Sequence, residues 1–110
     1  MSISTHVLDI GKGVPAVGVA VTLLLRGPGG GWMEAAQEVT DSDGRVREFD
    51  AASEPGEYRL EFATAAYFAS LGVESLYPSV VVDFEVRDPD AHYHVPLLLA
   101  PFGYTTYRGS

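Results

Sequence analysis

The sequence predicts an all-β fold, an antiparallel β-sandwich with one short helix. Apolar residues recur mostly with a period of two, which is typical of strands that bury one face and expose the other. Clusters of turn-forming residues separate these runs, and about seven or eight short strands at such spacing favour a sandwich. The sequence shows no internal repeat, no linker and no change of composition along the chain, so residues 1–110 are interpreted as a single domain.

Three runs carry the strand prediction most clearly. Residues 17–25 place valine and leucine at every second position. Residues 57–62 alternate aromatic residues and leucine with glutamate and arginine, and residues 80–86 repeat this alternation with valine and phenylalanine. Glycine, proline and aspartate gather between the runs, as turns require, at residues 27–31, 41–44, 54–56 and 88–90.

One short helix is expected from Thr64 to Leu71. Thr64 is a suitable N-cap, and Gly72 is a suitable residue for ending the helix. Tyr67 and Leu71 lie four positions apart, which places them on the same face of a helix. These two side chains are expected to seat the helix on the sandwich.

Composition excludes several classes of protein. The chain has 7 basic and 15 acidic residues, a formal net charge of −8, and Lys12 as its one lysine. This charge opposes binding to nucleic acid, which relies on Lys and Arg at the phosphates. No cysteine is present, so a disulfide scaffold, a thiolate nucleophile and a cysteine zinc site are excluded. No apolar run reaches the ~20 residues of a membrane helix and no signal peptide is recognisable, so a cytoplasmic protein is expected.

Two histidines lie on one face of a predicted strand near the end of the chain. His92 and His94 alternate with a second set of side chains that point to the opposite face: Tyr93, Val95, Leu97 and Leu99. A His-x-His pair can ligate zinc, but further ligands would have to come from His6 or a carboxylate. The alternative is one exposed histidine and one hydrogen-bonded within the sheet. Histidine is also the side chain best suited to proton transfer near neutral pH.

His6 and Arg45 are further candidates. His6 belongs to a predicted first strand on the face opposite Ile3, where a surface histidine is the plain interpretation. Arg45 follows a turn in which Gly44 is expected to adopt a positive φ. The turn lacks the later ligands of a calcium loop. Arg45 is either a solvated strand residue or a planar donor that pairs with a flat heterocycle or a developing oxyanion.

The last four residues, Tyr107 to Ser110, are interpreted as part of a site. Most chain ends fray and carry little information, whereas this one carries tyrosine, arginine and serine side chains. A strand continued from Tyr104 would place Arg108 and Ser110 on one side and Tyr107 on the other. Tyr107 and Ser110 therefore share a pocket only if the strand ends or twists before Ser110. Ser110 lacks the strained turn of a nucleophilic serine, so holding a water molecule is its expected role.

Three segments together resemble the transthyretin-related 5-hydroxyisourate hydrolases: STHVLD at 4–9, TDSDGR at 40–45 and HYHVPLLLAPFGYTTYRGS at 92–110. The resemblance covers essentially the whole chain. It implies a transthyretin-like sandwich of two four-stranded sheets with one short helix. It also implies a homotetramer, built as a dimer of dimers, with active sites at the interface between dimers.

The same resemblance implies hydrolysis of 5-hydroxyisourate to 2-oxo-4-hydroxy-4-carboxy-5-ureidoimidazoline in urate catabolism. The implied functional residues are His6, Arg45, His94, Tyr107 and Ser110. His94, with Ser110, would activate water; Arg45 would hold the ring and the oxyanion; His6 would orient the substrate or protonate the departing nitrogen. Tyr107 would bind substrate. No metal or cofactor is implied, His92 has no assigned role, and which histidine acts as base is left open.

Two other classes are compatible with a sandwich of this size. Vertebrate transthyretin shares the family fold but carries thyroid hormone, and it lacks the YRGS ending and these histidines. A carrier of a small aromatic ligand would keep its binding after loss of His94. A bare immunoglobulin-like or carboxypeptidase-associated module would show no catalysis at all.

Overall fold

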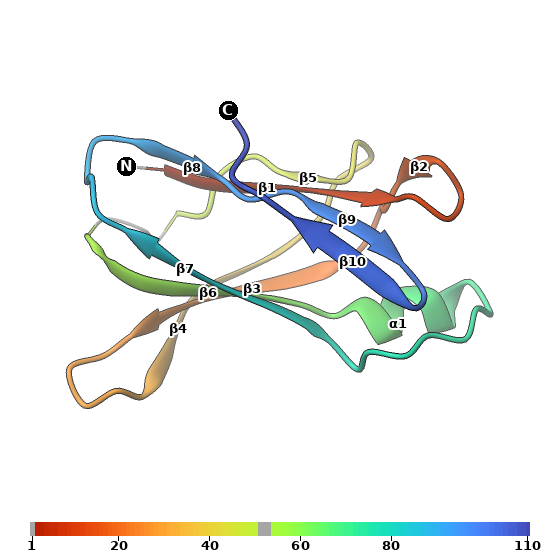
Figure 1. The fold of residues 1–110 in the computed structure, drawn as a ribbon, viewed down its shortest axis with the longest axis horizontal. Helices are drawn as coiled ribbons and strands as arrows, with labels where there is room; N and C mark the ends of the chain where they lie inside the picture. The colour runs from red at the N-terminus through yellow and green to blue at the C-terminus, as the bar shows by residue number, and fades with distance from the viewer. Residues whose placement is uncertain (1, 51–53) are drawn as a thin grey trace.

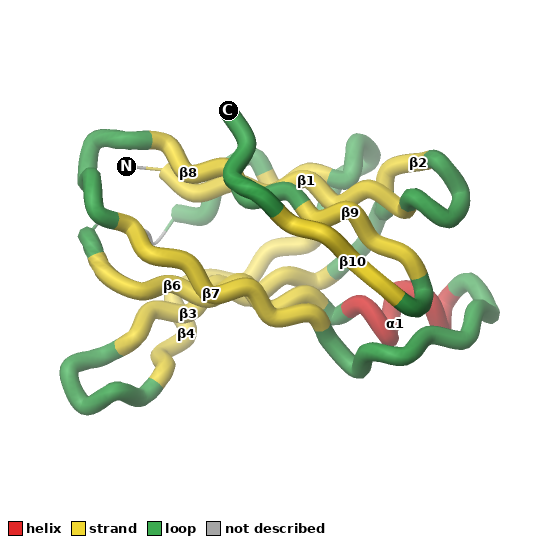
Figure 2. The backbone as a smooth tube through the Cα atoms, in the orientation of Figure 1, coloured by secondary structure: helices red, strands yellow, loops and turns green. Residues whose placement is uncertain are grey.

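The computed structural model describes residues 2–50 and 54–110 (Figure 1). The chain forms two β-sheets packed face to face and one short helix, as the sequence predicts (Figure 2). In chain order the elements are β1 (Ser2–Asp9), β2 (Val14–Pro15), β3 (Ala20–Arg26), β4 (Trp32–Val39), β5 (Arg45–Val46), β6 (Gly56–Phe62), α1 (Thr64–Ser70), β7 (Val80–Val86), β8 (His92–His94), β9 (Leu97–Ala100) and β10 (Gly103–Thr106).

One sheet has four strands in the order β4-β3-β6-β7, and all its pairings are antiparallel. The alternation predicted for 57–62 and 80–86 is confirmed in β6 and β7. The run at 17–25 becomes a strand only from Ala20, because Gly18 adopts a φ of +83° and Val17 remains exposed.

The second sheet differs from the prediction in two ways. It contains six strand segments rather than four, and β1 pairs in parallel with β8 and β9. The segments β8 and β9 run consecutively beside β1 and are separated at Val95 and Pro96, where proline supplies no backbone N–H to the ladder. The short segments β2 and β5 pair antiparallel with β1, and β10 pairs antiparallel with β9. The predicted antiparallel arrangement therefore holds for most pairings and fails where β1 runs beside β8 and β9.

The inner faces of the two sheets form the core. Tyr93, Val95, Leu97 and Leu99 all point inward and are buried, as the alternation predicts. Side chains from the four-stranded sheet join them in the core: Val21, Leu23, Tyr58, Leu60, Phe62, Val80 and Val86. Val19, just before β3, is buried in the same core. His92 and His94 consequently lie on the outer face of the six-stranded sheet, where solvent reaches them.

The helix α1 is where predicted, but its ends differ in detail. Ala63 is the N-cap and Thr64 is already helical; the Thr64 hydroxyl is buried without a hydrogen-bond partner among the described residues. Gly72 ends the helix with a φ of +69°, which confirms its predicted role. Tyr67 is buried as expected, whereas Leu71 remains 41% exposed and does not seat the helix. Within the described part of the chain, no helix has the length and apolar character needed to cross a membrane.

Candidate active site

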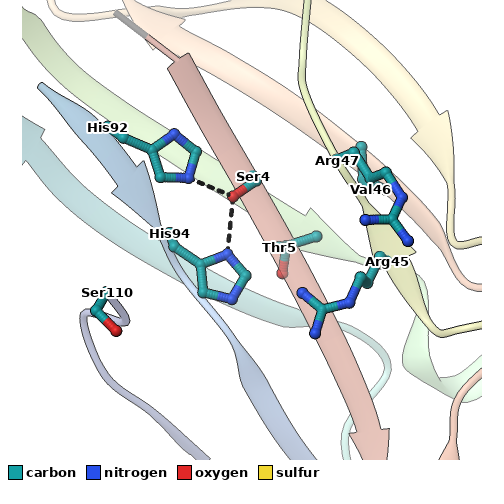
Figure 3. A pocket seen from close by; sticks show the side chains of 8 residues that line it. All are labelled: Ser4, Thr5, Arg45, Val46, Arg47, His92, His94 and Ser110. Atoms are coloured by element: carbon teal, nitrogen blue, oxygen red, sulfur yellow. Dashed lines mark hydrogen bonds between the residues drawn. The ribbon is translucent and has the colours of Figure 1, made fainter. Parts of the chain in front are cut away.

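A hollow of about 210 Å³ opens on the outer face of the six-stranded sheet. Strands β1, β5 and β8 and the C-terminal segment contribute its lining (Figure 3). The lining residues are Ser4, Thr5, Arg45, Val46, Arg47, His92, His94 and Ser110. Three of the five predicted site residues, namely Arg45, His94 and Ser110, therefore converge on one hollow.

The parallel register of β1 and β8 positions the two histidines. Ser4 lies directly opposite His94, and Ser2 lies opposite His92. The Ser4 hydroxyl is hydrogen-bonded to Nδ1 of His94 at 2.8 Å and to Nε2 of His92 at 3.0 Å. The other ring nitrogen of His92 is hydrogen-bonded to Ser2 Oγ. The Nε2 atom of His94 is thus the one histidine nitrogen of this pair that faces the open hollow.

The tight turn before β5 positions Arg45 at the hollow. The Asp41 carboxylate accepts hydrogen bonds from the backbone N–H groups of Asp43 and Arg45, each at 2.9 Å. The bond from Arg45 lowers the pKa of Asp41, so this carboxylate stays ionised and keeps the turn. Gly44 has the predicted positive φ of +76°, and a Cβ there would lie 2.5 Å from the Val7 carbonyl oxygen. Only glycine fits this turn.

His6 lies next to the hollow, although it is not among the residues that line it. His6 pairs with Arg45 across β1 and β5, so their side chains share the outer face of the sheet. Its Nε2 atom is hydrogen-bonded to the Asp43 carbonyl oxygen at 2.9 Å. A carbonyl can only accept, so His6 carries a proton on Nε2 and presents Nδ1 elsewhere.

The C-terminal segment leaves β10 after Thr106 and returns to the edge of β8. The backbone N–H of Gly109 donates to the His94 carbonyl oxygen at 2.8 Å. A Cβ at Gly109 would lie 2.5 Å from Cδ2 of His94, so the absence of a side chain lets the segment pass against the ring. Figure 3 shows Ser110 on one side of His94 and Arg45 on the other.

Tyr107 is the predicted site residue that the structure places elsewhere. Its exposed side chain lines a second, more apolar hollow together with Arg108. Arg108 stacks there on the Tyr93 ring, 4.4 Å from the ring centroid. The strand ends before Ser110, as a shared pocket would require, but the turn carries Ser110 toward His94 and leaves Tyr107 behind.

The surroundings of His94 favour its neutral form. Partial burial lowers the pKa of His94 below its ordinary value of 6.5, and the charges of Arg45, His92 and His6 lower it further. A neutral imidazole with one nitrogen open to the hollow can accept a proton from water near neutral pH. The Arg45 guanidinium beside it offers donors only, so it can bind an oxyanion but cannot compete as a base.

The histidine pair is poorly arranged for a metal. Three of its four ring nitrogens are hydrogen-bonded to serine hydroxyls. Across residues 2–50 and 54–110, no three His, Asp or Glu side chains converge as a metal site would require. These donors fit proton transfer better than metal ligation.

Comparison with known proteins agrees with the sequence resemblance. The profile of the HIUase/Transthyretin family matches residues 3–109. The 5-hydroxyisourate hydrolase of Mus musculus is 44% identical over 111 residues, covering 98% of this chain and 94% of the mouse protein. The 5-hydroxyisourate hydrolase of Salmonella dublin is 42% identical, covering 98% of this chain and 80% of its own.

Solved structures of a 5-hydroxyisourate hydrolase and of a transthyretin share this fold. The 5-hydroxyisourate hydrolase of Klebsiella pneumoniae superposes with a TM-score of 0.89 at 42% identity, with all of both chains covered. Sea bream transthyretin in complex with thyroxine gives a TM-score of 0.89 at 34% identity, covering 97% of this chain and 93% of that one. The fold and its similarity to these solved structures define a transthyretin-like β-sandwich. The chain belongs to the HIUase/Transthyretin family.

Two residues of the site escaped the sequence analysis. Ser4 joins both histidines, and His92 had no assigned role. Ser4 lies two positions before His6 on β1, and this spacing could have indicated that both side chains face the same side of the sheet. The parallel pairing of β1 with β8 is a contact between the two ends of the chain, and no local pattern predicts it.

Proposed function

We propose that this protein hydrolyses 5-hydroxyisourate to 2-oxo-4-hydroxy-4-carboxy-5-ureidoimidazoline. The observation that carries the proposal is a half-buried histidine, His94, whose open nitrogen faces a hollow that Arg45 also lines. The relatives support the substrate, because proteins named as 5-hydroxyisourate hydrolases match 98% of this chain at 42–44% identity.

His94 is the general base in this mechanism. Its Nε2 atom takes a proton from a water molecule as the water oxygen bonds to the ring carbonyl carbon. A lowered pKa keeps His94 unprotonated and ready for this step at neutral pH. General base assistance of this kind contributes about 10²–10⁴-fold. Ser110, beside His94 in the hollow, holds the water by a hydrogen bond.

Arg45 stabilises the charge that develops on the carbonyl oxygen. Its side chain lines the hollow, and its backbone N–H is held by the Asp41 carboxylate of the preceding turn. A preorganised donor of this type contributes about 10²–10³-fold to kcat. The planar group also matches the edge of a flat heterocyclic substrate.

His6 completes the proton transfers. The ring C–N bond breaks after water has added, and the departing nitrogen needs a proton. His6 lies beside Arg45 with its Nε2–H held by the Asp43 carbonyl oxygen, and in its doubly protonated form it supplies that proton from Nδ1. None of these steps requires a metal or a cofactor, and metal independence stays a prediction. Tyr107 lies at the second hollow, so we leave it out of the proposed site.

Assembly and location stay predictions that fit the family. A homotetramer is supported by unpaired sheet edges at β7 and β10, beside which large apolar side chains such as Phe102 are exposed. A dimer of dimers that meets through the outer face of the six-stranded sheet would cover the open hollow and separate the reacting water from bulk solvent. A cytoplasmic location is tested by cell fractionation.

A coupled assay tests the proposed function. Urate and urate oxidase generate 5-hydroxyisourate in place, and its ultraviolet absorbance is followed with and without the protein. We expect wild type to accelerate the decay, and we expect His94→Ala and a variant lacking residues 107–110 to lose most of the acceleration. Gly103→Ala is the control, because a Cβ there meets no atom within 4 Å.

The same preparation distinguishes a carrier from an enzyme. Sea bream transthyretin is known in complex with thyroxine, so thyroxine binding is measured by calorimetry alongside the assay. Folded wild-type protein that binds thyroxine but leaves the decay rate at its spontaneous value would support the carrier and refute the hydrolase.

A further inference from the structure

Two serines and two histidines form a continuous hydrogen-bonded row on the outer face of the six-stranded sheet. Because β1 and β8 are parallel and in register, alternate residues of both strands face the same side. The bonds run from Ser2 to His92, from His92 to Ser4 and from Ser4 to His94. The row links His94 in the hollow to His92, which is exposed at the strand end.

Hydrogen counting couples the members of this row. The Ser4 hydroxyl has one proton and lies between two ring nitrogens, so it donates to one histidine and accepts from the other. If Ser4 accepts from Nδ1 of His94, it donates to Nε2 of His92, and His92 carries its proton on Nδ1 toward Ser2. The opposite direction would put a proton on Nε2 of His94, where it would block the base.

The charges around His94 select the first direction. In Figure 3 the open nitrogen of His94 points toward the Arg45 guanidinium, which has donors only. A lone pair on Nε2 is favoured beside that cation, whereas an N–H bond there is disfavoured. Arg47 also lines the hollow, where it pairs with Asp41 and Asp43 at its edge, and His6 lies on the same face of β1. The titratable side chains that line the hollow itself are therefore basic.

We infer that Ser4 and His92 are positioning residues that hold His94 as the tautomer with its proton on Nδ1. The Nε2 lone pair then points into the hollow. The expected effect on turnover rests on the proposed function, whereas the tautomer itself does not. Ser4 also accepts from Nδ1 when His94 becomes an imidazolium, so the hydrogen bond stabilises the charge that forms during water attack. His92 keeps the Ser4 proton directed away from His94.

Burial explains why this arrangement matters. Ser4 is only 5% exposed, so water cannot readily replace a missing partner. A histidine nitrogen is protonated or bare according to the hydrogen bond that the other nitrogen makes. The rings of His92 and His94 are close to parallel, at 12° with centroids 6.3 Å apart, which suits one hydroxyl bridging their facing edges.

Nitrogen NMR of the ring tests the tautomer without any substrate. Protein labelled with ¹⁵N in histidine is recorded above the His94 pKa, and the His94 signals are assigned by their loss in His94→Ala. We expect a protonated Nδ1 and a bare Nε2 in wild type. Ser4→Ala should shift His94 toward the Nε2–H form, while Ser4→Thr, which keeps a hydroxyl, should retain the wild-type tautomer. A wild-type His94 protonated on Nε2 would overturn the inference.

Kinetics test the effect on turnover. Ser4→Ala should lower kcat about tenfold, the size of one lost hydrogen bond to a charged group, with KM nearly unchanged. His92→Gln keeps an amide oxygen that accepts from Ser4 and should stay near wild type, whereas His92→Leu should lose activity severalfold. The control is Ser79→Ala, which also removes a serine hydroxyl. Ser79 lines a different hollow, beside residues of β3, β4 and β6.

The two measurements separate the two proposals. No acceleration by wild type refutes the hydrolase, and the NMR result still decides the tautomer. The positioning role would be overturned, with the hydrolase left in place, by one set of results. Wild type would accelerate the decay, Ser4→Ala would keep the wild-type kcat, and His92→Gln and His92→Leu would have equal rates.

Discussion

At the scale of single residues, the state of His94 decides what the hollow can do. Its lowered pKa has partial burial as the first cause and the charge of Arg45 as the second. The Nε2 atom is the acceptor that faces the hollow, and its lone pair is available only while the ring is neutral. Activity and pH are therefore linked through this residue.

We expect an NMR titration of His94 to have its midpoint below 6.5. The variant Arg45→Gln removes a neighbouring positive charge, so the pKa of His94 should rise toward its ordinary value. The acid limb of kcat/KM should follow the wild-type midpoint, with activity lost as pH falls through it. A midpoint above 6.5, or one that Arg45→Gln lowers, would contradict the electrostatic account.

The same shift has a consequence for stability. The unfolded chain binds a proton at His94 with the ordinary pKa, and the folded protein binds it only at lower pH. This contribution to the free energy of unfolding is complete above about pH 6.5 and is lost as pH falls through the folded-state pKa. Urea unfolding of wild type and His94→Gln across this range should show the smaller pH dependence in the variant.

Gly109 should be essential for placing the His94 ring. A Cβ at Gly109 would lie 2.5 Å from Cδ2 of His94, so Gly109→Ala must displace the ring or the segment. A misplacement of about 1 Å costs on the order of 10²-fold in rate. We expect kcat/KM to fall by that order while circular dichroism stays unchanged. Gly103→Ala is the matched control, and equal rates for the two variants would refute the close-packing argument.

At the scale of elements, helix α1 is tied to the six-stranded sheet by a buried polar pair. The Tyr67 hydroxyl donates to Asp9 at 2.8 Å, and Asp9 is almost fully buried at the end of β1. Burial and this bond raise the pKa of Tyr67 to about 12, so the phenol stays protonated and able to donate. Asp9 also accepts a hydrogen bond from the backbone N–H of Lys12, at 3.1 Å.

Loss of this tie should be measurable. Tyr67→Phe removes a donor from a buried carboxylate and should lower the free energy of unfolding by about 1.5–3 kcal/mol. Chemical denaturation measures the change, and Tyr77→Phe serves as control because its ring contacts Tyr104 edge-on. A loss below about 0.5 kcal/mol for Tyr67→Phe would show that the bond is not a major anchor.

Elements also show what the sequence could and could not predict. Alternation correctly assigned His92 and His94 to one face and Tyr93 to the other, because side-chain direction in a strand is local. The parallel pairing of β1 with β8 is not local, and so the role of Ser4 was missed. Tyr107 was grouped with Ser110 by resemblance, yet the turn after Thr106 separates them. The helix cap at Ala63 was missed because propensity favours threonine.

At the scale of the whole molecule, the fold alone does not decide the function. A hydrolase and a thyroxine-bound transthyretin superpose on this chain with the same TM-score of 0.89. Function therefore has to be argued from the site. Here the outer face of one sheet brings a neutral histidine, an arginine and a serine together, and this combination suits hydrolysis better than passive binding. That residues 1–110 form one domain stays a prediction.

Assembly belongs to the same scale. We expect light scattering to give a particle of four times the 11.8 kDa chain mass. Closure of the hollow by a second dimer would exclude bulk solvent and strengthen the interaction of Arg45 with an oxyanion. Specific activity should then fall on dilution in step with dissociation. A monomer with full activity per chain would contradict the proposed interface site.

The measurement that tests the central claim most directly is the decay of 5-hydroxyisourate with wild type, His94→Ala and Gly103→Ala side by side. We predict strong acceleration by wild type and Gly103→Ala. We predict a loss of about 10²-fold or more for His94→Ala, with the thermal unfolding midpoint little changed. Equal acceleration by a folded His94→Ala variant would contradict the assignment of His94 as the base.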